Sequence, residues 1–265
     1  MREAGVLFTV MEDPQKNTFS GLVGFTSIGG LILLWIVGAY LTADASILPY
    51  PWTVLEVMGK EARSGELLRH SLATLARVAA AFCIAMGLGT ALGLLLGRFP
   101  KLDMWANPWV VVFLNVPALV VIVLCYLWIG LNEVAAIVAV SVNKTAMVLV
   151  TVREGAQNMN RAISEMAQVY RMTRWQRLRH IVLPQLAPFL SASARNGLAV
   201  IWKIVLVVEF LGRSNGIGFQ IHLYFQLFDT AHVLAYAMTF VAVMGVIEYA
   251  LLKPAETRAL KWRRA

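Results

Sequence analysis

Five charged side chains interrupt stretches of the sequence that otherwise carry almost no charge. They are Arg77, Lys144, Arg195, Lys203 and Glu209. A cation among apolar residues costs several kcal/mol unless it is paired or faces water, so each position predicts an ion pair or a polar path. Cations lining a path would give it a positive potential and suit an anionic cargo. Alternatively, these cations pair with Glu133, Glu209 or Glu248, or extend to the membrane surface.

No arrangement of residues predicts catalysis by this chain. The sequence has no G-x-x-x-x-G-K-[ST] phosphate loop, because Gly59-Lys60 is followed by Glu61 and lacks the upstream glycine. The histidines lack the spacing of metal ligands; they are His70, His180, His222 and His232. We therefore predict no catalytic residue, no metal site and no cofactor bound by this chain.

The composition indicates a membrane protein. Of the 265 residues, 59% are hydrophobic and only 14% are charged, with a mean hydropathy of +0.68. Soluble domains are about 45–50% apolar and about 25% charged, so the chain is neither an ordinary soluble domain nor a disordered one. The two cysteines lie in apolar runs and are too few for a disulfide scaffold. We expect an all-α, polytopic membrane protein.

Six runs poor in charge are each long enough to cross a bilayer, which takes about 20 apolar residues. By number, they cover 21–41, 71–97, 108–131, 134–152, 184–211 and 233–252. Pro117 lies inside the third run, so a kink is expected there. A short helix over 52–63 is expected to lie at the outer membrane surface, in contact with lipid. The predicted transmembrane domain therefore spans residues 21–252.

The net charge of +8 orients these runs. With both termini in the cytoplasm, fifteen lysines and arginines fall on the inner side and far fewer on the outer side. The positive-inside rule then predicts an N-terminal cytoplasmic segment over 1–20 and a basic cytoplasmic tail over 253–265. Because the rule accounts for the basic charge, no nucleic-acid partner is predicted.

The only long connection on the inner side covers residues 153–184. It is too polar to lie in the membrane and too regular to be a linker. Apolar residues recur at helical spacing from Ile163 to Ile181, with a break near residue 172. Ser164 is expected to cap a helix that begins at Glu165, and Pro184 to begin the next span. Two short amphipathic helices rich in arginine would suit docking onto another protein.

This loop resembles the "EAA" loop of bacterial ATP-binding-cassette importer permeases, whose pattern is E-A-A, three residues, G, nine residues, I, any residue, L-P. The spacing matches that pattern from Glu165 to Pro184. Met166 stands where the pattern has alanine. Arg171 stands where it has glycine, which disfavours a tight turn between the two helices. The resemblance implies ATPase contact through Glu165, Met166, Ala167, Arg171, Thr173, Arg174, Ile181, Leu183 and Pro184.

Other segments resemble the branch of these permeases that imports nitrate, taurine, alkanesulfonates or bicarbonate. They include LPYPWTVLEVM, NVPALVVIVLCYLWIGLNE and VVEFLGRSNGIGFQI, and the resemblance covers roughly residues 45–255. It implies the MetI-like permease fold of a type I importer in the bacterial cytoplasmic membrane. The implied partners are a second permease copy, a cytoplasmic ATPase dimer that uses ATP and Mg, and a periplasmic or lipid-anchored substrate-binding protein. The loop 153–184 would contain the coupling helix.

The resemblance also implies that the turn over 212–218 folds back at the external mouth and meets the binding protein. The alternative is a solvated loop in which Glu209 pairs with Arg213. Three other functions stay open: an importer of a different small organic nutrient, a small secondary carrier, and a membrane scaffold. The loop spacing favours ATPase docking over a carrier, and no inverted repeat relates residues 21–131 to 134–252.

Overall fold

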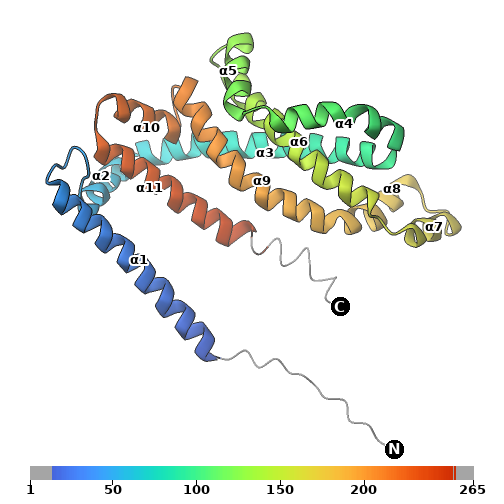
Figure 1. Cartoon of the computed structure of the whole chain (residues 1–265), viewed down its shortest axis with the longest axis horizontal. Coiled ribbons are helices and arrows are strands. Elements are labelled where there is room, and N and C mark those ends of the chain that lie inside the picture. Colours follow the sequence, from blue (N-terminus) through green and yellow to red (C-terminus); the bar gives the residue numbers. More distant parts are fainter. Residues whose placement is uncertain (1–13, 253, 255–265) are drawn as a thin grey trace, which may run out of the picture.

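A computed structural model describes residues 14–252 and Pro254 of the chain. Every described element is a helix (Figure 1), so the all-α prediction is confirmed. The elements are α1 (Pro14–Thr42), α2 (Pro51–Ser64), α3 (Glu66–Arg98), α4 (Pro100–Asn115), α5 (Ala118–Ile129), α6 (Glu133–Gln157), α7 (Arg161–Val169), α8 (Arg174–Arg177), the π-helix η1 (Leu178–Val182), α9 (Leu183–Gly212), α10 (Ile217–Gln226), α11 (Thr230–Ile247) and the π-helix η2 (Glu248–Leu252). Nearly all of the predicted basic tail, and the first part of the predicted segment 1–20, lie outside the described residues.

The centre of the molecule is formed by α3, α6 and α9. Three glycines spaced four residues apart on α3, Gly89, Gly93 and Gly97, let it lie directly on α6. A Cβ atom at Gly93 would stand 2.7 Å from the carbonyl oxygen of Leu149 and 2.8 Å from Cβ of Val152. Such close approach is what a small-xxx-small series permits between membrane helices.

Three of the described helical segments are long and apolar enough to cross a bilayer: α3, α6 and Thr230–Ala250. The pair α4 and α5 would make a fourth if the two are taken as one span. The apolar part of α1 within the described residues is shorter, and α9 carries three charged residues along its length. The count of six spans therefore stays a prediction.

The kink expected at Pro117 is a sharp break. The helix α4 ends at Asn115, α5 begins at Ala118, and their axes differ by 95°. Val116 is extended, which is the conformation that a following proline favours, and Pro117 precedes the first residue of α5. The third apolar run is thus two helices joined by a corner.

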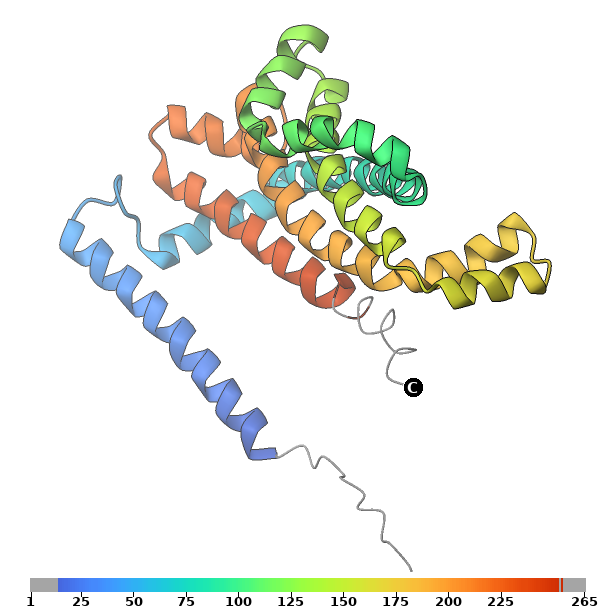
Figure 2. The same cartoon turned by 45° about the vertical axis from the view of Figure 1, so that its right-hand side comes forward.

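The N-terminal helix α1 diverges from the rest of the chain (Figures 1 and 2). Its described part exposes large apolar side chains, such as Leu31 at 70% and Leu34 at 75%, which suits a helix surrounded by lipid. The indole nitrogen of Trp35 donates to the carbonyl oxygen of Pro49, 3.0 Å away, and so ties α1 to the connection that leads into α2. The helix α2 occupies Pro51–Ser64, close to the predicted 52–63, and packs on α11.

The two ends of the central helices carry different structures. Figures 1 and 2 show α7 and α8 at one end of α6 and α9, and α10 at the other. The turn between α9 and α10 meets the beginning of α3 and of α6, whereas the loop 153–184 meets the end of α3.

Candidate functional site

The helix α6 continues to Gln157, so the first five residues of the loop predicted over 153–184 are helical, and the next helix of the loop is well capped. The Asn160 side chain accepts a hydrogen bond from the backbone N–H of Ala162 (2.9 Å), and the helix α7 begins at Arg161. The expectation that Ser164 caps a helix starting at Glu165 is wrong, because Asn160 starts the helix one turn earlier. The Asn160 N–H donates to Gln185 Oε1 (2.9 Å), which fastens the loop to α9.

The turn after α7 forms despite the absence of the glycine. Arg171 has a φ of +49°, in the left-handed region that favours glycine. Its N–H donates to the carbonyl oxygen of Gln168, and the N–H of Met172 donates to that of Ala167, each at 3.0 Å. This pair of bonds is a Schellman motif with arginine at the glycine position. Arg171 therefore does not prevent the turn, as its place in the pattern suggested. It adopts a strained backbone conformation within the turn instead.

The second half of the loop is fixed by a capping box. Thr173 Oγ1 accepts from the N–H of Gln176 (3.3 Å), and Gln176 Oε1 accepts from the N–H of Thr173 (2.9 Å). The chain then stays helical through η1 into α9, with Pro184 in the first turn of α9. The second short helix expected here is thus a continuous extension of the next long helix.

The loop leaves an apolar surface uncovered at its tip. Ala167 is buried, but several large apolar side chains stand free of the described residues, with Tyr170 at 75% and Trp175 at 67% exposed. Figure 2 shows α7 and α8 projecting from the helical core. We call this surface the docking surface; it comprises Met166, Val169, Tyr170 and Trp175. A patch of this kind at a protruding tip is typical of a protein-binding site.

The remaining residues of the predicted loop site have different surroundings. Glu165 is exposed on α7, and Arg171 and Thr173 are exposed at the turn. Ile181 is buried, whereas Leu183 is 40% exposed. The residues of the predicted loop site therefore divide into an exposed group, which includes Glu165 and Met166, and a buried group, which includes Ala167 and Ile181.

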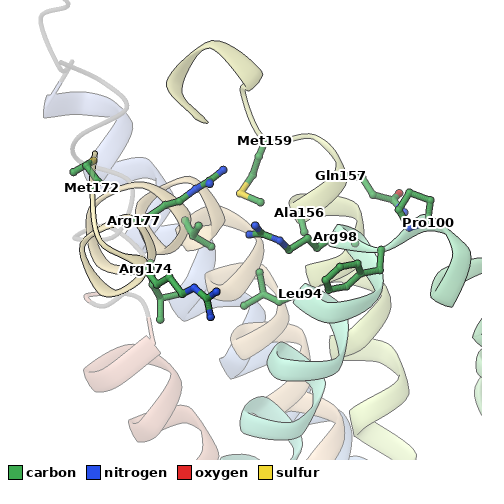
Figure 3. A pocket seen from close by; sticks show the side chains of 13 residues that line it. Leu94, Arg98, Pro100, Ala156, Gln157, Met159, Met172, Arg174 and Arg177 are labelled. Atoms are coloured by element: carbon green, nitrogen blue, oxygen red, sulfur yellow. The ribbon is translucent and has the colours of Figure 1, made fainter. Parts of the chain in front are cut away.

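A cavity of about 1060 Å³ lies between this loop and the ends of α3 and α6 (Figure 3). The Arg98, Arg174 and Arg177 side chains come to it from α3 and from α8. None of these arginines has a carboxylate partner within the described part of the chain. Sequence reasoning missed this cluster, because the four helices α4, α5, α6 and α7 separate Arg98 from Arg174 along the chain.

The other end of the central helices contains a buried charge network. Arg77 Nη1 lies 2.6 Å from Glu209 Oε1, and Arg77 Nη2 lies 2.6 Å from Glu133 Oε1. Arg213 contacts the same oxygen of Glu133 at 2.6 Å, and Arg77 also donates to the side chain of Asn215. Glu209 therefore pairs with Arg77, whereas Arg213, the partner considered for Glu209 in the alternative of a solvated loop, pairs with Glu133.

The turn between α9 and α10 is built around this network. Glu209 Oε2 accepts from Thr74 Oγ1 and from the N–H of Gly218, each at 2.9 Å. Gly216 has a φ of +110°, and a Cβ atom there would stand 2.3 Å from Cδ of Glu209. The N–H of Gly216 donates to His70 Nδ1 (3.0 Å). The turn is therefore fixed by hydrogen bonds and is not a freely solvated loop.

The five charged residues of the predicted path do not form one cluster. Arg77 and Glu209 belong to the network, whereas Lys144 lies about halfway along α6 and is 2% exposed. Lys203 is exposed on α9. Arg195 lines a small cavity with Glu248, one of the carboxylates considered as its partner.

Comparisons with known proteins agree with this architecture. The family model described as the binding-protein-dependent transport system inner membrane component matches residues 84–252. A Bacillus subtilis (strain 168) protein, named for the transport of aliphatic sulfonates, is 27% identical over 97% of this chain and 93% of its own length. The taurine transport system permease of Escherichia coli (strain K12) is 26% identical over 89% of each chain.

A third relative carries a different name, and one solved structure shares the fold. The riboflavin transport system permease of Chloroflexus aurantiacus is 28% identical over 88% of this chain and 87% of its own. The inward-facing methionine ABC transporter has a TM-score of 0.62 at 18% identity, covering 74% of this chain and 98% of the other.

Proposed function

The chain belongs to the family of binding-protein-dependent transport system inner membrane components, and we propose that it carries a small sulfonate or another small anion across the bacterial cytoplasmic membrane. It is a permease subunit of an ATP-binding-cassette importer. In this function, the loop 153–184 holds a cytoplasmic ATPase dimer, a binding protein delivers the cargo, and both termini lie in the cytoplasm.

The observation that carries the coupling role is the docking surface. Burying its apolar side chains against a partner would be favourable by about 25 cal/mol per Å² of apolar area removed from water. These side chains are Met166, Val169, Tyr170 and Trp175. The helices that present them are held by the Asn160 cap and the Thr173 capping box, so their shape is set before a partner arrives. A preformed apolar tip on the side with the basic connections suits a cytoplasmic protein partner.

Energy from the ATPase would reach the central helices through a continuous helical path. The residues from Arg174 to Gly212 form one unbroken helical run, which joins the docking surface to Glu209 in the charge network at the other end. Closure of an ATPase dimer would then move α9 as a rigid body and change the packing at its far end. The π-helix Leu178–Val182 supplies a place where this run can bend.

Names of relatives support the cargo class. Relatives named for aliphatic sulfonates and for taurine are 26–27% identical, and both cargoes carry a negatively charged sulfonate group. The relative named for riboflavin, at 28% identity, supports a second candidate, an uncharged small organic nutrient. The Lys144 side chain, buried without a carboxylate partner in the described part of the chain, favours the anionic cargo.

A second copy of the chain is expected to complete the membrane unit. The helix α9 leaves one face uncovered by the described residues, including Ala192, Asn196, Ala199 and Lys203 at helical spacing. Two such faces opposite each other would enclose a path that contains Lys203, and Arg195 lies beside the same face. The turn over 212–218, fixed to α3 and α9, would present a firm surface to the binding protein at the outer end.

The coupling role is tested with a matched pair of substitutions. Met166→Asp changes the docking surface, where Met166 is 48% exposed, and Met104→Asp changes a methionine on α4, outside the loop, that is 74% exposed. We expect the unchanged chain and Met104→Asp to copurify with a cytoplasmic ATPase and to stimulate ATP hydrolysis, whereas Met166→Asp does neither. Equal capture of the ATPase by both variants would count against the docking surface.

Substrate uptake separates the importer from a secondary carrier. Proteoliposomes that contain the chain, the ATPase and the binding protein should accumulate taurine or an alkanesulfonate only when ATP is supplied. Uptake driven by an ion gradient with no ATPase present would support the carrier instead, and uptake of an uncharged nutrient alone would support the second cargo.

A further inference from the structure

Lys144 is a buried cation on α6 to which the described residues offer a single weak acceptor. Its side chain is 2% exposed and lies between α6 and α9, with Cε 3.5 Å from the position of a Cβ atom at Gly197. The contact found for Nζ is Met147 Sδ, at 2.8 Å. A thioether sulfur is a weak acceptor, and an ammonium group has three N–H donors. The charge of Lys144 is therefore left uncompensated by the described part of the chain.

Arg77 shows how this fold treats a cation that serves structure. Arg77 has two carboxylates within 2.6 Å and further acceptors from Asn215. Removing a buried cation from water without such partners costs several kcal/mol. A lysine at such a position with no carboxylate among the described residues points to an anionic partner from outside them.

A second group beside Lys144 lacks a partner in the same way. Ser193 is 5% exposed, and its Oγ atom has no hydrogen-bond partner among the described residues. Lys144 and Ser193 line one cavity of about 30 Å³, together with Met147, Thr151 and Asn196. A volume of this order holds about two water-sized groups. The cavity thus combines a cationic donor and a free hydroxyl with room for a small ligand group.

The cavity has a route to the outside through Met147. That side chain is 41% exposed, and both Asn196 and Ala192 on the α9 side of the cavity are exposed. An unbranched thioether side chain changes rotamer easily. If it turned outward, it would free the place beside Nζ and would open the cavity to the uncovered face of α9.

We propose that Lys144 and Ser193 form a binding station for a small anion, in which an oxygen of nitrate or of a sulfonate group replaces the Met147 thioether at the ammonium group. The station rests on the proposed anion import, and it lies midway between the docking surface and the charge network. Donation from Lys144 Nζ and Ser193 Oγ to one anion would satisfy both buried groups at once. The anion would replace the weakly accepting Met147 sulfur with a negatively charged oxygen, which forms a stronger hydrogen bond to the ammonium group than a neutral water oxygen does.

Chemical labelling of the purified full chain tests the station without any partner protein. A Met147→Cys variant reacts with a neutral maleimide, and mass spectrometry reads the extent at position 147. Cys83, which is exposed on α3, reports general reactivity in the same sample. Nitrate and ethanesulfonate are each added at constant ionic strength, which is maintained with gluconate, a far bulkier anion than either.

We expect nitrate and ethanesulfonate to slow labelling at position 147 several-fold without changing labelling of Cys83. Adding Lys144→Met to the Met147→Cys variant should abolish the protection. Adding Ser193→Ala should raise the half-protecting concentration about fivefold, as for the loss of one neutral hydrogen bond. Continued protection of Cys125, which is buried, from the maleimide verifies that each variant is folded. Ser193→Ala keeps the test decisive if Lys144→Met does not fold.

Three results would overturn the station. They are no protection by either anion, equal protection after Lys144→Met, and equal slowing at Cys83. Because the measurement needs neither the ATPase nor the binding protein, a negative result leaves the importer assignment intact. A failure to capture the ATPase would in turn leave the labelling result intact.

Discussion

Arg77 and Glu209, which are 132 residues apart in the sequence, form a buried ion pair with 2.6 Å between Nη1 and Oε1. The pair joins the first part of α3 to the last part of α9 and lies directly beneath the turn that leads to α10. Both side chains were candidates for a transport path on sequence grounds, and their geometry gives each of them a structural partner.

Breaking this pair should destabilise the protein in an asymmetric way. Arg77→Met leaves Glu209 buried and uncompensated, which costs about 3–5 kcal/mol, whereas Glu209→Gln leaves Arg77 paired with Glu133. We expect a larger loss of thermal stability in detergent for Arg77→Met than for Glu209→Gln. The double variant Arg77→Met with Glu209→Gln should lose less stability than the sum of the two single losses, and strictly additive losses would contradict direct pairing.

Replacing Arg171 with the glycine of the family pattern should stabilise the loop. Arg171 holds a φ of +49°, and a left-handed conformation costs a residue with a Cβ atom about 1–2 kcal/mol. Hydrogen exchange should show stronger protection of the α7 amides in Arg171→Gly, with docking of the ATPase preserved. Arg179→Gly is the matched control: Arg179 is helical, so glycine there should weaken protection.

The turn over 212–218 should tolerate no side chain at Gly216. A methyl group there would stand 2.3 Å from Glu209, and the φ of +110° disfavours alanine on its own. We expect Gly216→Ala to lower thermal stability sharply and to abolish uptake. Gly59→Ala on α2 meets no atom within 4 Å and should be neutral or slightly stabilising. A wild-type stability for Gly216→Ala would contradict the turn described above.

The positions of the long helices could be predicted from the sequence, but the breaks between helices and the angles at them could not. Apolar runs located α3 and α6 within a few residues, because hydrophobic length alone defines a span. The 95° break at Pro117 could be predicted only as a kink, since proline fixes the local backbone but not the packing that sets an angle. The continuity from α8 into α9 was missed, because a π-helical segment accommodates Pro184 there.

A functional site could be predicted from the sequence where its residues follow one another at a fixed spacing along the chain. The match from Glu165 to Pro184 located the loop, and an Asn160 side chain one turn upstream decided where its first helix begins. The partners of Arg77 were not predictable, because Glu133 and Glu209 come from two other helices and pairing is set by packing. The same holds for the arginine cavity, which needs the ends of α3 and α8 side by side.

The most direct test of the account is a photocrosslink from the docking surface to the ATPase. A benzophenone amino acid replaces Val169, which is 80% exposed on α7, and in a control chain it replaces Trp105, which is 80% exposed on α4. We predict a covalent adduct with the cytoplasmic ATPase from position 169 and not from position 105. No adduct from position 169, or equal adducts from both positions, would contradict the coupling role of the loop.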